Sequence, residues 1–74
     1  MKVETLVRMA NEIARNLRSL PGDEPRVATA EHVRSFWTPG MRASIMAHAE
    51  AGGAGLDPIA RDAVRLLGAP AGAG

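Results

Sequence analysis

The stretch "SFWTPGMR", residues 35–42, decides how this chain folds, because it holds the only Phe and the only Trp and breaks the chain between two apolar segments. Phe36 and Trp37 stand side by side, and Thr38-Pro39 follows at once. Threonine is a favoured helix N-cap and proline is favoured at the first helical position. The stretch therefore predicts that one helix ends at Trp37 and that another begins at Pro39.

Upstream of this break, the sequence from Val3 to about Leu20 predicts an amphipathic helix of about five turns. At about 100° per residue, its apolar side chains fall within an arc of about 120°. They are Val3, Leu6, Val7, Ala10, Ile13, Ala14 and Leu17. The polar residues Asn11 and Glu12 lie on the opposite side, and "PGDEP", residues 21–25, should stop the helix near Leu20.

A second helix is predicted from Glu24 or Arg26 to Trp37, with Asp23 available as its N-cap. Its apolar side comprises Ala30, Val33, Phe36 and Trp37.

Downstream of the break, the third helix should reach about Ala51, where Gly52-Gly53 ends it. Asp57-Pro58 repeats the N-cap and proline pairing and predicts a fourth helix to Leu67, with Gly68 just past its end. No alternating strand pattern is present. The fold class is therefore predicted to be all-α, a small bundle of about four short helices with no sheet. Residues 1–68 would form a single helical domain, and residues 69–74, "APAGAG", a flexible Ala/Gly/Pro tail.

The bulk properties exclude several classes of function. The 74 residues include no Cys, so thiolate zinc sites, self-held iron–sulfur clusters and Cys nucleophiles are ruled out. A net charge of +1 gives no electrostatic footprint for nucleic acid. No segment approaches the ~20 apolar residues of a membrane span. We therefore expect a soluble, cytoplasmic protein that binds neither nucleic acid nor membrane.

No motif predicts catalysis, a cofactor or a metal on this chain. His32 and His48 are the only imidazoles and are not spaced i,i+4, so surface or interface roles are favoured over metal binding. The Gly-rich "GGAGLDP", residues 52–58, lacks the Lys-Ser/Thr of a phosphate-binding loop and is better explained as a helix end and a tight turn. We expect a chain that is not itself an enzyme.

Arg42 and Trp37 each leave two interpretations open. Arg42 projects from the apolar arc of the third helix, either as a side chain that reaches along the surface to water or as a contact to a carboxylate or carbonyl on a partner. Trp37 either closes the second helix onto the third or anchors an interface, and both roles are compatible. Because the predicted core is mostly Ala, Val and Leu, a chain this short is expected to be marginal as a monomer or to complete its core on another chain.

Three blocks of the sequence carry a resemblance to a known family. "LVRMANEIA", "HVRSFWTPGMR" and "AGGAGLDPIARDAVRLL" resemble, in this order, the delta subunit of NAD-dependent molybdenum or tungsten formate dehydrogenases. The resemblance covers nearly all of residues 4–67. This chain has Gly40 where a second Arg is familiar in the family, and Asn16-Leu17 where aromatic residues are common.

The resemblance implies a non-catalytic accessory subunit of an enzyme complex. In that complex, formate is oxidised to CO2 at a molybdenum or tungsten bis-MGD centre, and electrons pass through iron–sulfur clusters and FMN to NAD. All of these cofactors would be held by the larger alpha, beta and gamma subunits. The delta chain would bind them, the catalytic alpha subunit first of all, and stabilise the complex. The alternative is a transient assembly factor that binds during molybdenum-cofactor insertion.

The predicted partner-binding surface combines two segments, the break at residues 36–42 and the glycine-rich turn at residues 52–56. Its residues are Phe36, Trp37, Pro39, Met41, Arg42, Ile45, Gly53, Gly55 and Leu56.

Overall fold

The computed structural model describes residues 1–68, which form four α-helices joined by short turns. The helices are α1 (Val3–Leu17), α2 (Glu24–Phe36), α3 (Pro39–Glu50) and α4 (Pro58–Gly68). No strand occurs within this described part, so the predicted all-α bundle is confirmed. The predicted flexible tail, residues 69–74, lies outside the described residues.

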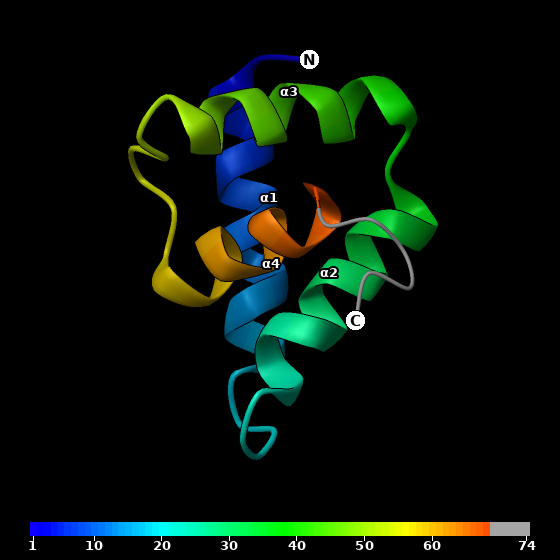
Figure 1. The fold of residues 1–74 in the computed structure, drawn as a ribbon, viewed down its shortest axis with the longest axis vertical. Coiled ribbons are helices and arrows are strands. Elements are labelled where there is room, and N and C mark those ends of the chain that lie inside the picture. The colour runs from blue at the N-terminus through cyan, green and yellow to red at the C-terminus, as the bar shows by residue number, and fades with distance from the viewer. Residues whose placement is uncertain (69–74) are drawn as a thin grey trace.

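The four helices share one apolar core. Figure 1 shows α3 lying across the end of α1 at which the chain starts, with the α1–α2 turn at the far end of α1. α4 packs mainly on α2 and also on α3 and α1. The core is thin, as predicted, because half of its ten buried apolar residues are alanines. These ten residues are Leu6, Ala10, Ala14, Ala30, Val33, Trp37, Ile45, Ala60, Ala63 and Val64.

The amphipathic pattern of residues 3–17 is confirmed by α1, which buries Leu6, Ala10 and Ala14. The helix ends at Leu17, three residues before the expected stop, and the amide of Leu20 then bonds to the Leu17 carbonyl at 3.1 Å.

Asp23 occupies the N-cap position of α2, as predicted, but its side chain does not cap the helix. Asp23 has helical backbone angles (φ −85°, ψ −3°) and its side chain makes no capping hydrogen bond. A capping side chain reaches the first-turn amides from an extended backbone. Here the turn of residues 21–24, closed by Glu24 N and Pro21 O at 3.2 Å, holds Asp23 in a helical conformation. Its carboxylate pairs with Arg26 instead, at 3.3 Å.

The helix ends after the break follow the predicted glycine pattern in one case and depart from it in the other. Gly52 and Gly53 end α3 with φ of +119° and +64°, which side chains rarely tolerate. The Gly53 amide bonds to the His48 carbonyl at 2.9 Å, as a helix C-terminal cap requires. Gly68, expected just past α4, is instead its last residue.

Candidate functional site

The break between α2 and α3 is built as its residue types predict. Trp37 leaves the helical conformation (φ −90°, ψ 145°), while its amide still bonds to the Val33 carbonyl at 2.9 Å. The Thr38 side chain then accepts a hydrogen bond from the Met41 amide at 3.3 Å, and Pro39 is the first residue of α3. The Thr-Pro prediction is therefore confirmed. Because the chain turns at Trp37, the indole swings into the core, where it is only 5% exposed.

Arg42 is engaged within the chain. Its Nη1 donates to the Trp37 carbonyl at 2.7 Å and to the Arg34 carbonyl at 3.3 Å. These carbonyls lie at the C-terminal end of α2, where helical partners are missing and a positive charge is favourable. Arg34 in turn donates to the Leu66 carbonyl at 3.3 Å, near the end of α4. Two arginines thus cross-link the C-terminal ends of α2 and α4 to their neighbours.

Phe36 was expected on the apolar side of the second helix, and this placement is wrong. Its side chain is 74% exposed and is the most exposed large apolar residue after Met1. Thr29, Ala30 and Val33 already fill the buried side of α2, and Trp37 turns inward behind them. The Phe36 ring therefore lies outside the core, with its centre 4.7 Å from that of His32, one helical turn earlier, and a tilt of 37° between the rings.

An open groove of about 580 Å³ lies beside the Phe36 ring. It is bounded by α1, the second half of α2 and the first turn of α3. Its lining is Met9, Glu12, Ile13, Asn16, His32, Phe36, Trp37 and Met41. We call this surface the Phe36 groove. Most of its lining is aromatic or aliphatic, and methionine and aromatic side chains are enriched in the centres of protein interfaces.

The glycine turn, residues 52–56 between α3 and α4, packs onto α1, which is distant from it in the sequence. Gly55 has a φ of +83°, and a Cβ added there would lie 3.4 Å from Cγ1 of Val7. Gly53 is buried, with φ +64°, and Leu56 is half-buried against the core. His48 Nε2 donates to the Ala54 carbonyl at 2.8 Å. The turn is therefore held from α3 as well as from α1.

Asn11 is the residue in this region that the sequence pattern missed. Its Nδ2 donates to the Gly55 carbonyl at 2.8 Å, and its Oδ1 accepts from the Asp57 amide, also at 2.8 Å. A primary amide can satisfy both groups at once, because it offers a donor and an acceptor on one carbon. Periodicity placed Asn11 on the polar side of α1. Nothing in the local sequence links it to Gly55 and Asp57, which lie 44 and 46 positions further along the chain.

The structure therefore divides the predicted partner-binding residues into different environments. Trp37, Ile45 and Gly53 are buried, and Ile45 has no exposed surface. Met41, Arg42 and Leu56 are half-buried. Phe36, Pro39 and Gly55 are exposed, but only Phe36 presents a large apolar side chain. Of the predicted set, Phe36, Trp37 and Met41 meet in the Phe36 groove.

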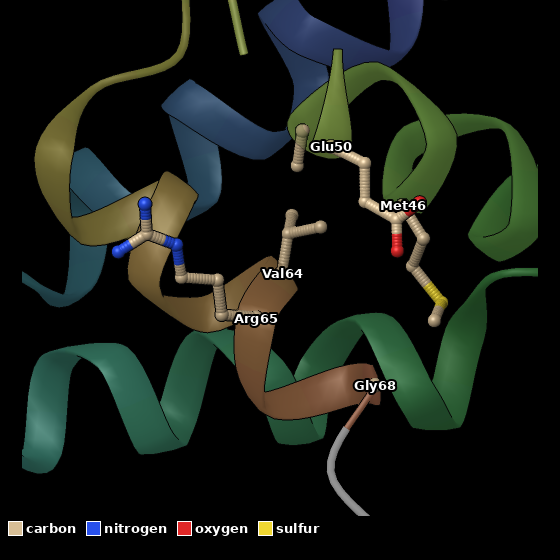
Figure 2. Close-up of a pocket in the computed structure, with 6 residues that line it drawn as sticks. Met46, Glu50, Val64, Arg65 and Gly68 are labelled. Atoms are coloured by element: carbon tan, nitrogen blue, oxygen red, sulfur yellow. The ribbon is translucent and has the colours of Figure 1, made fainter. Parts of the chain in front are cut away.

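A second hollow, of about 420 Å³, lies between α3 and α4. Figure 2 shows Met46 and Glu50 on one side of it and Arg65 pointing away on the other, with Val64 between them. The nearest carboxylate partner of Arg65 is Asp62 of its own helix, at 3.7 Å. Glu50 and Arg65 both line the hollow, but Arg65 forms its ion pair with Asp62 and not with Glu50.

Two features of the residues present concern iron–sulfur clusters and metal ions. The chain has no Cys for an iron–sulfur cluster. Among residues 1–68, no three His, Asp or Glu side chains are close enough together to hold a metal ion. His32 stacks on Phe36, and His48 bonds to a backbone carbonyl. No helix of the described part is both long and apolar enough to cross a membrane.

Comparison with known protein families gives a match over most of the chain. The family described as "NADH-dependant formate dehydrogenase delta subunit FdsD" matches residues 5–64, which include α2, α3 and most of α1 and of α4. Searches of curated proteins and of solved structures gave no match. The matched range includes both the break at residues 36–42 and the glycine turn. The chain therefore belongs to the FdsD family of formate dehydrogenase delta subunits.

Proposed function

We propose that this chain is a non-catalytic accessory subunit that binds the cofactor-bearing alpha subunit of a cytoplasmic NAD-dependent formate dehydrogenase and stabilises it. In this proposal the molybdenum or tungsten bis-MGD centre, the iron–sulfur clusters, FMN and NAD are all held by the larger subunits. Family membership supports the place in the complex. The absence of Cys from the chain supports the division of labour.

The observation that carries the binding role is the exposure of Phe36. A phenylalanine that is 74% exposed beside a groove lined by Met9 and Met41 is costly in water. Burying the exposed part of this ring contributes about 3–4 kcal/mol, from roughly 150–250 Å² per aromatic side chain at about 25 cal/mol per Å². That is enough to change a dissociation constant roughly 100- to 1,000-fold.

The test is co-expression of the large subunits with variants of this chain. Phe36→Ala should weaken association roughly 10- to 100-fold and reduce formate-dependent NAD reduction at limiting chain concentration. Val27→Ala is the matched control, because Val27 is another exposed apolar residue of α2, 42% exposed, and lies outside the groove. Equal complex yield and activity for both variants would refute the binding role of Phe36.

The purified complex also distinguishes between two possible roles of this chain, a permanent subunit and a transient assembly factor. A permanent subunit stays with the purified, metal-loaded enzyme in a fixed ratio, as measured by native mass spectrometry and metal analysis. An assembly factor is recovered only with alpha subunit that lacks its metal centre, and this result would replace the proposal.

A further inference from the structure

The free charge in the Phe36 groove is negative. Glu12 is the only acidic residue in its lining, and it is exposed. Within residues 1–68, the ion pairs are Arg26 with Asp23 and Arg65 with Asp62, so Glu12 has no cationic partner there. Arg42, the basic residue of the neighbouring break, donates to two carbonyls of α2 and does not line the groove.

This charge decides what kind of segment fits the groove. A partner that covers the apolar lining also removes water from the rim, where Glu12 stands. A carboxylate that loses its water without a cationic partner is strongly destabilising. A covering segment avoids this cost if it brings a positive charge to Glu12 as well as an apolar side chain to Phe36, Met9 and Ile13.

We propose that the Phe36 groove binds a segment of the large subunit in which an apolar side chain is flanked by an arginine or lysine. The apolar side chain sits against the Phe36–His32 ring pair and Met9, and the basic group pairs with Glu12. This proposal places a positive charge on the partner. A partner contact by Arg42 would instead require a carboxylate or a carbonyl there. This inference rests on the proposed function and adds the chemistry of the partner surface.

Charge reversal at two positions tests the pairing. Glu12→Arg places a positive charge in the groove, and Glu31→Arg makes the same change at an exposed position of α2 outside it. Both are measured for binding of the full chain to the purified large subunits, with circular dichroism to check that each variant is folded. Glu12→Arg should weaken binding roughly tenfold or more, and Glu31→Arg by less than about twofold. Equal effects of the two substitutions would overturn the inference.

A charge swap then identifies the partner residue. A photo-crosslinking amino acid at position 16, an exposed position in the lining of the groove, marks the segment of the large subunit that covers the groove, and mass spectrometry locates it. Replacing the basic residue of that segment by Glu should restore binding of Glu12→Arg at least fivefold, by remaking the pair in reverse. A crosslinked segment without Arg or Lys, or a swap that restores nothing, contradicts the inference while leaving the subunit role intact. If the unchanged chain itself fails to bind the large subunits, both the proposed function and this inference fall.

Discussion

Removing the side-chain amide of Asn11 should destabilise the fold by more than its position on the polar side of α1 suggests. Asn11→Ala deletes two hydrogen bonds of 2.8 Å, one to the Gly55 carbonyl and one from the Asp57 amide. Each contributes about 1 kcal/mol net, and the Asp57 amide is left without its partner in a partly buried place. Alanine returns roughly 0.5 kcal/mol through its higher helix propensity. The expected net loss is about 1–2 kcal/mol.

In a domain of this size, 1 kcal/mol corresponds to about 4–8 °C in Tm. Thermal unfolding of the full chain, followed by far-ultraviolet circular dichroism, should therefore show a Tm lower by roughly 4–16 °C. Asn16→Ala is the matched control, because Asn16 is an exposed asparagine of the same helix with no side-chain hydrogen bond in the described part. Asn11→Asp should fall between the two, since it keeps an acceptor for Asp57 and loses the donor to Gly55. Equal Tm values for Asn11→Ala and Asn16→Ala would refute the claim that Asn11 fastens the glycine turn to α1.

Four further substitutions test the local geometry, and the effect of each is measured by urea unfolding of the full chain. Arg42→Met keeps an unbranched apolar stem but loses the hydrogen bonds to the Trp37 and Arg34 carbonyls, so the free energy of unfolding should fall by about 1–2 kcal/mol. An unchanged urea midpoint would contradict the role of Arg42 in capping α2. Gly55→Ala should cost about 1–2 kcal/mol because of its positive φ and the contact to Val7, whereas Gly40→Ala, in open space within α3, should gain about 0.5–1 kcal/mol. Both glycine variants shifting in the same direction would speak against this reasoning. Ile45→Ala should cost about 2–5 kcal/mol, because Ile45 is the only residue that α3 buries completely; a loss under about 1 kcal/mol would show that α3 packs differently.

The parts of the fold that the sequence predicted are those that depend on local chemistry. The 3.6-residue period of α1, the Thr38-Pro39 helix start and the Gly52-Gly53 helix end each follow from a few neighbouring residues. Asp23 failed as a cap because a preceding turn imposed helical backbone angles on it, and residue type alone does not report those angles.

The candidate site was less predictable because it depends on contacts between distant segments. Phe36 and Trp37 are adjacent and equally apolar, yet one is 74% exposed and the other 5%. Only the point at which α2 ends decides which ring enters the core. Likewise, Arg42 meets carbonyls of α2, and Glu12 meets the Phe36 groove, through packing of α1, α2 and α3 that no local pattern contains.

Oxidative footprinting of the methionines tests the docking surface most directly. Met9 and Met41 line the Phe36 groove, whereas Met46 lines the hollow between α3 and α4, and all three are half-buried in the chain alone. Methionine oxidises readily to the sulfoxide when it is accessible, so mass spectrometry can compare the three sites in the free chain and in the assembled complex. If the groove is the docking surface, oxidation of Met9 and Met41 should fall at least fivefold on assembly while that of Met46 stays within about twofold. If assembly protects Met46 and leaves Met9 and Met41 unchanged, the partner binds at the hollow between α3 and α4, and this result would contradict the account.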